Sequence, residues 1–339
     1  MAPPQLDELD RRLIGALHLA PRATWDDIGG ILGADASTLK RRFDRLSTAR
    51  MIRVIGQTDW GLHSTAMPVH VFLDITGETP LAVLDRLRTV PHLQVLAQIS
   101  GGYPLYAVVH APSESATSEA IDRLFSVPGV RRVNALPALS TLRRGATWDP
   151  QFLTESERAG LLTLTGAQPE GTATATAKPL GDTERTVVTQ LIQDGRASAA
   201  SIGRAAGLPT STAHRVVRRV LDERWVRPRL EVVSEWLGFR TPFVLRLRVS
   251  PGATPDVMRH LDRLPQTRVS AHVASDFSVL CVGLVADRPA LAAFIDDELA
   301  AIPGILAVTV DVILTEPRRY WFDRDQSSGL GEFRAPALL

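Results

Sequence analysis

The first fifty residues place apolar side chains at the spacing of α-helices. One stripe recurs every three or four positions: Leu6, Leu9, Leu13 and Leu17. A second helix is predicted to begin after Thr24, which forms a capping-box pattern with Asp27, and to end at Gly33. A third helix, over residues 37–47, turns three apolar side chains inward: Leu39, Phe43 and Leu46. These fifty residues therefore predict a three-helix unit.

From residue 67 onward the pattern changes to that of a sheet. Four apolar residues alternate with other residues, which is typical of a half-buried strand: Val69, Val71, Leu73 and Ile75. Five further elements follow: a helix from Leu81 to Val90, strands at 95–100 and 103–110 joined by Gly101-Gly102, a helix at 113–126 and a strand at 130–142. The order β-α-β-β-α-β predicts a ferredoxin-like α+β sandwich.

The whole arrangement occurs twice in the chain. Residues 22–53 match residues 196–227 without a gap, at an offset of 174 that is given by 196 − 22 and by 227 − 53. The matched pairs include apolar, glycine and arginine positions. The sandwich repeats at the same offset, which becomes 175 where Pro128-Gly129-Val130 matches Pro303-Gly304-Ile305. The inward positions of the third helix return as apolar residues: Ala213, Val217 and Val220. We therefore interpret the chain as a tandem duplication.

This repeat divides the 339 residues into six segments. The expected segments are a helix-turn-helix at 1–58, a sandwich at 64–146, a linker at 147–179, a second helix-turn-helix at 180–232, a second sandwich at 238–321 and a tail at 322–339. The linker is expected because residues 171–177 alternate Thr and Ala after a glycine and no core-forming pattern precedes them. The tail is polar and contains glycine, so we expect it to be loosely ordered.

Composition adds little to this division. The net charge of +1 does not by itself indicate an anionic partner. The single cysteine, Cys281, lies in an apolar run and is expected to be a buried, inert thiol. No apolar run reaches the length of a membrane span, and the N-terminus lacks the pattern of a secretory signal. We therefore expect a cytoplasmic protein without a membrane partner.

The third helix of each three-helix unit carries the candidate chemistry. In a helix-turn-helix this helix enters the major groove of DNA, where arginines bind guanine or phosphate and hydroxyl groups near the helix start bind phosphate. The candidate DNA-binding residues are Ser37, Thr38, Lys40, Arg41, Arg42, Arg45, Ser211, Thr212, His214, Arg215, Arg218 and Arg219. The alternative is a solvated basic face. We favour DNA, because Arg41/Arg215 and Arg45/Arg219 match although exposed residues have no packing reason to match.

Arg22 and Arg196 have a different expected role. Each precedes a helix start, so we predict that they make structural hydrogen bonds to backbone carbonyls rather than contacts with DNA.

These residues resemble the helix-turn-helix of the Lrp/AsnC (feast/famine) transcription regulators. The resemblance rests on the order of several short motifs: Leu9-Asp10-x-x-Leu13, Pro21-Arg22-Ala23-Thr24, Ile28, Leu32-Gly33, Ser37-Thr38, Arg41-Arg42, Leu46 and Ile52. The sandwich behind them is similar to the family's ligand-sensing domain. The resemblance implies binding of double-stranded DNA, self-association through the sandwich sheets and control by amino acids or related small molecules. We expect no cofactor.

The turn between the two central strands departs from the family. There the family has Gly-x-aromatic-Asp, which helps to form its effector site. Here the turns read Gly101-Gly102-Tyr103-Pro104 and Ser275-Asp276-Phe277-Ser278, without that aspartate. The candidate effector-binding residues are Gly101, Gly102, Tyr103, Ser275, Asp276 and Phe277. A plain hairpin without a ligand is the alternative.

The fusion is a second departure, because family members usually carry one unit per chain. Two units in one chain could pair internally, as a pseudo-dimer that presents two different helices to DNA. Lys40-Arg41-Arg42 and His214-Arg215-Val216 would then contact an asymmetric site.

An enzyme of the same architecture is the main competing hypothesis. Fused two-unit chains also resemble sirohaem decarboxylases of haem biosynthesis, which need His, Tyr and Arg residues to hold a carboxylate-rich tetrapyrrole. No arginine lies near the predicted hairpin, and His92, His110 and His272 do not recur across the halves. No pattern of metal ligands, phosphate-binding glycines or a nucleophile with its base stands out. We therefore predict a regulator rather than an enzyme.

Overall fold

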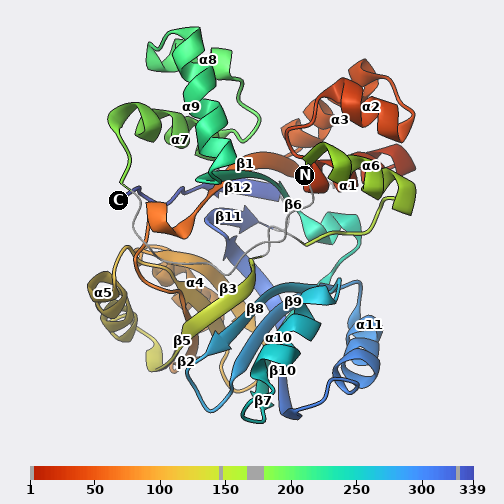
Figure 1. The fold of residues 1–339 in the computed structure, drawn as a ribbon. Helices are drawn as coiled ribbons and strands as arrows, with labels where there is room; N and C mark the ends of the chain where they lie inside the picture. The colour runs from red at the N-terminus through yellow and green to blue at the C-terminus, as the bar shows by residue number, and fades with distance from the viewer. Residues whose placement is uncertain (1–3, 145–147, 166–178, 326–328) are drawn as a thin grey trace.

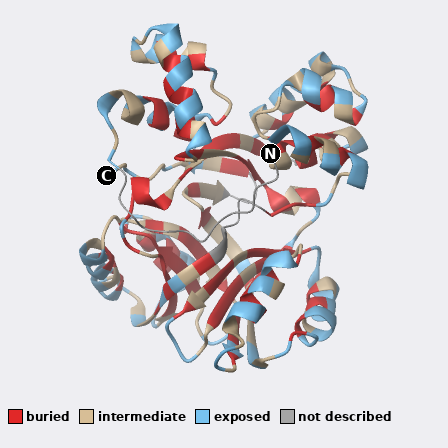
Figure 2. Cartoon of the chain, in the orientation of Figure 1, coloured by how far each residue is buried: buried red, intermediate tan, exposed pale blue. Residues whose placement is uncertain are grey.

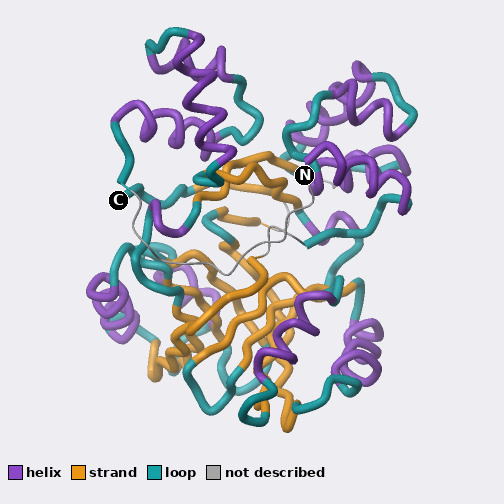
Figure 3. The backbone as a smooth tube through the Cα atoms, viewed as in Figure 1, coloured by secondary structure: helices purple, strands orange, loops and turns teal. Residues whose placement is uncertain are grey.

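The structure, a computed structural model, describes residues 4–144, 148–165, 179–325 and 329–339. Two groups of helices lie above a body of strands, and further helices cover the outer sides of that body (Figure 1). Figure 3 shows most of the strands in the lower part of the molecule and a smaller group directly below the two groups of helices.

The first half contains three helices, a strand, a short 3-10 helix and then the predicted β-α-β-β-α-β order. Its elements are α1 (Glu8–Leu19), α2 (Trp25–Leu32), α3 (Ala36–Thr48), β1 (Ile52–Thr58), η1 (Trp60–Leu62), β2 (Val69–Ile75), α4 (Pro80–Leu87), β3 (Leu93–Ile99), β4 (Leu105–Val109), α5 (Glu114–Phe125) and β5 (Val130–Arg144). We refer to α1–α3 as the first three-helix unit.

The second half has the same order, and α6 (Glu155–Thr165) precedes it. Its elements are α7 (Asp182–Gln193), α8 (Ala199–Ala206), α9 (Thr210–Asp222), β6 (Val226–Val232), η2 (Ser234–Leu237), β7 (Thr241–Val249), α10 (Thr254–Arg263), β8 (Thr267–Val273), β9 (Val279–Val285), α11 (Arg288–Ala293), the π-helix η3 (Phe294–Leu299), β10 (Ile305–Arg319), β11 (Phe322–Asp325) and β12 (Gly329–Phe333). We refer to α7–α9 as the second three-helix unit.

The strands of the two halves form a double sheet that closes on itself. Each half contributes four antiparallel strands, and the last strand of each continues from its own sheet into the other half's sheet. Thus β5 pairs with β2 and then with β8, while β10 pairs with β7 and then with β3. The halves are therefore joined at both edges by backbone hydrogen bonds, and neither of these edges is left open.

Three apolar layers follow from this arrangement. Helices α4 and α5 cover the outer face of the first sheet, and α10 and α11 cover that of the second. The inner faces of both sheets pack against each other through a third cluster, which includes Phe72, Tyr106, Val244 and Leu280. Burial is concentrated in the strands between these helices (Figure 2). Cys281 is a buried free thiol, as the sequence predicts.

A separate two-stranded sheet lies between the three-helix units and the double sheet. It pairs β1 with β6 in antiparallel register, from Ile52 opposite Val232 to Thr58 opposite Val226. Helix α3 is followed directly by β1, and α9 by β6. Each three-helix unit is therefore connected to this sheet through the strand that follows its third helix.

The expected linker is wrong for part of its length. Within 147–179 the structure describes 148–165, where α6 forms and packs against α1 and α2. Trp148 is 2% exposed and Leu161 is completely buried in the core of the first three-helix unit. Residues 171–177, on which the linker prediction rested, lie outside the described residues.

The expected tail is also wrong. Strands β11 and β12 pair with each other, and β11 pairs with the end of β10. Phe322 is completely buried, and Leu330 is 4% exposed. The carbonyl oxygens of Leu338 and Leu339 accept hydrogen bonds from Arg185 on α7. The described part of the tail is therefore a structural element that contacts the second three-helix unit.

Candidate functional site

The third helix of each three-helix unit is held by its apolar face. In α3, Leu39 and Leu46 are completely buried and Phe43 is half-buried. The corresponding positions of α9 are buried as well: Ala213, Val217 and Val220. The inward faces predicted from the sequence are therefore confirmed.

In each three-helix unit, a glycine ends the second helix and allows a compact turn before the third. Gly33 ends α2 in the left-handed region at φ 67°, and Gly207 ends α8 in the same way at φ 64°. Gly29 sits where a Cβ atom would overlap the carbonyl oxygen of Ala34, so the turn approaches α2 closely. The Thr24 and Asp27 capping box begins α2, as predicted.

The candidate DNA-binding residues divide by exposure. Nine are exposed to solvent: Ser37, Lys40, Arg41, Arg45, Ser211, His214, Arg215, Arg218 and Arg219. The others, Thr38, Arg42 and Thr212, are half-buried. Exposure alone does not make a side chain available to DNA, because several of these cations have carboxylate partners.

Arg45 and Arg219 recur for a structural reason that sequence reasoning missed. The Arg45 Nη2 atom lies 2.6 Å from a carboxylate oxygen of Asp10, whose side chain is 2% exposed. One repeat later, Arg219 Nη1 lies 2.6 Å from the carboxylate of Glu184. Asp10 and Glu184 are themselves separated by 184 − 10 = 174 residues. The pair recurs as a unit that joins the first and third helices, so the assumption that Arg45 and Arg219 have no packing reason to match is wrong.

Arg42 turns back toward α1 rather than outward. Its Nη1 atom lies 2.7 Å from Asp7 and 2.9 Å from Asp10. The side-chain hydrogen bonds that Arg42 donates to these two carboxylates raise the pKa of Arg42, and the bond to Asp7 lowers the pKa of Asp7. At the corresponding positions of the second half, Val216 replaces Arg42 and Gly181 replaces Asp7. Both partners of the ion pair are therefore absent from the second half, which also indicates a structural role.

Arg41 and Arg215 behave differently. Both are exposed, and neither has an ion-pair partner among the residues that the structure describes. Lys40 and Arg218 make ion pairs with Asp44 at 2.5 Å and Asp222 at 3.4 Å, one helical turn away on the exposed surface. Exposed pairs of this kind contribute little and can exchange for a phosphate. Arg41 and Arg215 are therefore the matched cations that are available to an anionic partner.

Arg22 and Arg196 hold the two three-helix units together. Arg22 donates to the carbonyl oxygens of Gly195 at 2.6 Å and Ala197 at 3.1 Å. Arg196 donates in return to Pro21 at 2.7 Å and Ala23 at 3.0 Å. The prediction of structural backbone hydrogen bonds is confirmed, and the bonds cross between the halves. This reciprocal contact fixes how α3 and α9 are oriented relative to each other.

The six candidate effector residues lie at two turns of the double sheet. Gly101 adopts φ 90°, and a Cβ atom there would overlap the carboxylate of Asp311. Arg246 pairs with Asp311 at 3.0 Å, and its guanidinium carbon lies 5.8 Å from the Tyr103 ring and 5.3 Å from the Phe277 ring. One buried cation thus connects the two turns. Gly102, Ser275 and Asp276 are exposed.

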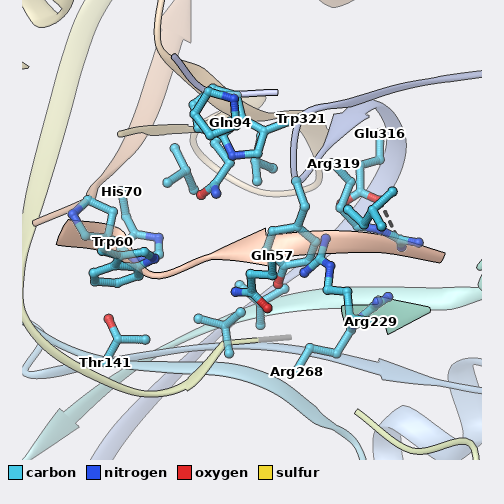
Figure 4. Close-up of a pocket in the computed structure, with 18 of the residues that line it drawn as sticks. Gln57, Trp60, His70, Gln94, Thr141, Arg229, Arg268, Glu316, Arg319 and Trp321 are labelled. Carbon is cyan, nitrogen blue, oxygen red and sulfur yellow. Dashed lines mark ion pairs between the residues drawn. The ribbon is translucent and has the colours of Figure 1, made fainter. Parts of the chain in front are cut away.

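A cavity lies elsewhere, between the double sheet and the two-stranded sheet. It has a volume of about 100 Å³, and none of the six candidate effector residues lines it. Its polar lining includes Gln57 from β1, Arg229 from β6, Arg268 from β8 and Arg319 from β10. His70 and Trp60 line the opposite side (Figure 4). We call this space the central cavity.

Burial dominates the electrostatics of the central cavity. It lowers the pKa of Arg268 to about 10, with the positive charge of Arg319 acting in the same direction. Burial also lowers the pKa of His70 to about 4, and the His70 Nδ1 atom lies 2.7 Å from the Tyr106 hydroxyl. His70 is therefore neutral near pH 7, whereas the arginines stay charged. The sequence analysis did not identify these cavity residues. The only sequence pattern that indicated them was a charged side chain within an otherwise apolar strand.

The residues that the structure describes contain no cluster of His, Cys, Asp and Glu that could hold a metal ion. None of their helices is long and apolar enough to cross a membrane.

These features define a class: an α+β protein that combines three-helix units with β-α-β-β-α-β sandwiches. Comparison with protein families then identifies two domains. Residues 6–47 match the AsnC-type helix-turn-helix domain, and residues 243–320 match the Lrp/AsnC ligand binding domain. The chain therefore carries the two domain types of Lrp/AsnC transcription regulators, one matched in each half.

Curated relatives agree with this family. An uncharacterised HTH-type transcriptional regulator of Pyrococcus abyssi is 26% identical over 146 residues, which is 43% of this chain and 92% of that protein. A corresponding regulator of Pyrococcus horikoshii is 25% identical over the same length. Each relative thus corresponds to less than half of this chain.

A solved structure is similar over nearly the whole chain. The sirohaem decarboxylase NirDL covers 92% of this chain and 93% of its own, with a TM-score of 0.58 and 11% sequence identity. At this identity the likeness shows a shared fold.

Proposed function

We propose that the chain is a sequence-specific, DNA-binding transcription regulator built from two fused Lrp/AsnC-like units, and that it acts on double-stranded DNA in the cytoplasm. In this proposal the second three-helix unit is a second helix-turn-helix. The offset of 174 residues, the repeated element order and the repeated pairs Asp10/Arg45 and Glu184/Arg219 support the fusion. The strands that join the halves would then make the chain an internal pseudo-dimer.

One observation carries the proposal: Arg41 and Arg215 occupy equivalent exposed positions on α3 and α9 and have no carboxylate partner in the described chain. An exposed arginine that recurs without a structural partner is explained by a ligand common to both units. Helices held by the reciprocal contact of Arg22 and Arg196 would enter successive major grooves about one helical turn apart. Lys40 and His214, which precede the two arginines, would make the two half-sites different.

The test compares matched arginine variants. Arg41→Ala and Arg215→Ala should each weaken binding to a DNA fragment selected from random genomic DNA by about 1–3 kcal/mol. If the side chain binds phosphate, each variant should also reduce the slope of the logarithm of the DNA-binding constant against the logarithm of the salt concentration by about one. Both variants should melt like the wild type, because neither side chain is packed. The control is Arg263→Ala, which should bind DNA normally. Arg263 is exposed on α10, a helix that covers the outer face of the second sheet.

The proposal fails if both variants bind the selected fragment as tightly as the wild type at physiological salt. Arg45→Ala adds a contrast, because its guanidinium is held by Asp10. Its main effect should be a lower melting temperature.

A second candidate function is the decarboxylation of sirohaem. Two observations favour it: the fold likeness to NirDL, and the three arginines, two histidines and two tyrosines that line the central cavity. The sequence argument against an enzyme considered the hairpin and the histidines. Its expectation that no arginine lies near the hairpin is wrong, because Arg246 lies between the two turns, and the cavity arginines lie outside the hairpin. The cavity volume of about 100 Å³ argues against a tetrapyrrole, which is far larger. Incubation with sirohaem, followed by analysis for a decarboxylated product, separates the two functions. We propose that no product forms.

A further inference from the structure

The central cavity is enclosed by two layers that belong to different parts of the fold. Gln57 on β1 and Arg229 on β6 contribute from the two-stranded sheet, and Arg268 and Arg319 contribute from the double sheet. Figure 4 shows Gln57, Arg229 and Arg268 on one side of the cavity. A molecule in this space would therefore contact both layers at once.

The charges around this side of the cavity do not balance. Arg229 pairs with Glu231, and Arg319 pairs with Glu316 at 3.2 Å. Arg324 bridges Glu316 and Glu235, both at 2.9 Å. Arg268 is 6% exposed and has no ion-pair partner in the described chain. A buried, unpaired cation is costly, so proteins normally pair such a charge.

The unpartnered polar atoms show which kind of group is missing. Nε and Nη1 of Arg268 are buried without a hydrogen-bond acceptor, as are Nε of Arg229 and Nε of Arg319. All four are N–H donors, whereas the unpartnered Oε1 atom of Gln57, which lines the same cavity, is an acceptor that an ammonium or hydroxyl group of the ligand would satisfy. A carboxylate is acceptor-only and matches the planar fork of a guanidinium, so it would satisfy both the charge and the donors. The Arg268 guanidinium also stacks over the Trp148 ring at 5.1 Å, which holds it in place.

The size of the cavity limits the ligand. A buried water needs about 10–15 Å³ of volume measured in this way, so 100 Å³ accommodates roughly seven to ten water-sized atoms. This volume favours a small mono- or dicarboxylic acid, or an amino acid, over a tetrapyrrole.

The lining is asymmetric although the fold is repeated. One repeat apart, Arg268 corresponds to Gln94, Arg229 to Ile55, and Tyr106 to Leu280. Two of the three cavity arginines thus have uncharged counterparts, whereas Arg319 corresponds to Arg144 at the offset of 175; a pair of equivalent sites would keep all three cations in both halves. The lining therefore fits one ligand per chain, bound in one orientation.

We propose that the central cavity binds one small carboxylate-bearing metabolite per chain, with Arg268 as its principal charged contact. The same ligand would link the double sheet to β1 and β6, which lead directly from α3 and α9. As an effector site this deepens, and rests on, the proposed regulator function. As a binding site it stands independently of DNA.

The experiment uses the full chain without DNA. Its melting temperature is measured with acetate, succinate or L-glutamate at matched ionic strength, and with succinamide as the uncharged control. At least one carboxylate should raise the melting temperature of the wild type by about 2 °C or more at saturation, and succinamide should not. Calorimetric titration with that carboxylate should give one site per chain. If none of the three acids stabilises the chain, or if two equivalent sites appear, the proposal is overturned.

Variants identify the site. Arg268→Gln should abolish the carboxylate response and should melt no lower than the wild type without ligand, because it removes an unpaired buried charge. Gln57→Glu places a carboxylate in the cavity itself and should also abolish the response. Arg263→Gln, an exposed arginine on α10, should respond like the wild type. A full response in Arg268→Gln or Gln57→Glu contradicts the proposal. DNA binding is measured separately, so loss of one activity does not obscure the other.

Discussion

Asp10 offers a direct measure of what the repeated ion pairs contribute. Its carboxylate is buried and binds Arg42 at 2.9 Å and Arg45 at 2.6 Å. Its counterpart Glu184 binds Arg219 at 2.6 Å, but the Glu184 side chain is 19% exposed. The same chain thus contains a buried and a more exposed version of one interaction.

The expected magnitudes follow from this burial. Exposed ion pairs contribute about 0–1 kcal/mol, whereas removal of one partner from a fully buried pair costs about 3–5 kcal/mol. The Asp10 side chain is 2% exposed, but its partners Arg42 and Arg45 are 23% and 44% exposed, so solvent screens part of the interaction. Asp10→Asn, which removes the charge and keeps the shape, should therefore cost about 2 kcal/mol. Glu184→Gln should cost about 0.5 kcal/mol.

Urea unfolding, followed by circular dichroism and by amide hydrogen exchange in α1 and α3, measures both losses. Hydrogen exchange is needed because the three-helix units and the double sheet need not unfold together. In Asp10→Asn, protection should fall in α1 and α3 more than in α7 and α9. Equal losses in the two variants, or a larger loss in Glu184→Gln, would refute the argument that burial sets the size of this interaction.

Two further predictions concern pH and backbone packing. Burial lowers the pKa of His18 to about 3 and of His70 to about 4, so both are neutral when folded, while the unfolded chain binds protons below about pH 6.5. Stability should therefore fall as pH drops from 6.5 to 4, by about 1.4 kcal/mol per pH unit for each histidine, and less steeply in a His18→Gln, His70→Gln variant; equal urea midpoints at pH 7 and pH 5 in the wild type would contradict this. Gly29→Ala should destabilise the first three-helix unit by about 2 kcal/mol or more, because its Cβ meets the Ala34 carbonyl, whereas Gly30→Ala has open space and should stabilise α2 by about 0.5–1 kcal/mol. Thermal melting checks the glycine pair, and a Gly29→Ala variant as stable as Gly30→Ala would show that the turn relaxes.

Local signals were sufficient for much of the fold. Helix caps such as Thr24, the glycine ends of α2 and α8, and the alternation in β2 depend on neighbouring residues, so a sequence pattern contains them. The sequence pattern did not predict helix α6, because a helix of eleven residues is only marginally stable in water without tertiary contacts. Its stability comes from packing against α1 and α2, more than a hundred residues earlier in the chain, with Leu161 in their buried core.

The central cavity could not be predicted from the sequence for a different reason. Alternation in a strand identifies two faces but not what covers each face. Arg246 and Arg268 occupy strand positions where a polar residue predicts solvent, yet a second layer covers each of them: the first half's sheet over Arg246 and the two-stranded sheet over Arg268. That layer comes from strands far away in the sequence, so its presence depends on how β5 and β10 join the two sheets.

The repeat separates two kinds of arginine that look alike in the sequence. A structural arginine changes together with its partner: Arg45 and Asp10 persist as Arg219 and Glu184, while Arg42 and Asp7 disappear together as Val216 and Gly181. Arg41 and Arg215 persist although no residue of the described chain accounts for them. Recurrence alone is therefore weak support for a functional residue, because a conserved pair recurs as well. Recurrence without an internal partner is stronger, since the constraint then has to come from something outside the chain, and two exposed guanidinium groups on matching helices are suited to a polyanion with matching sites.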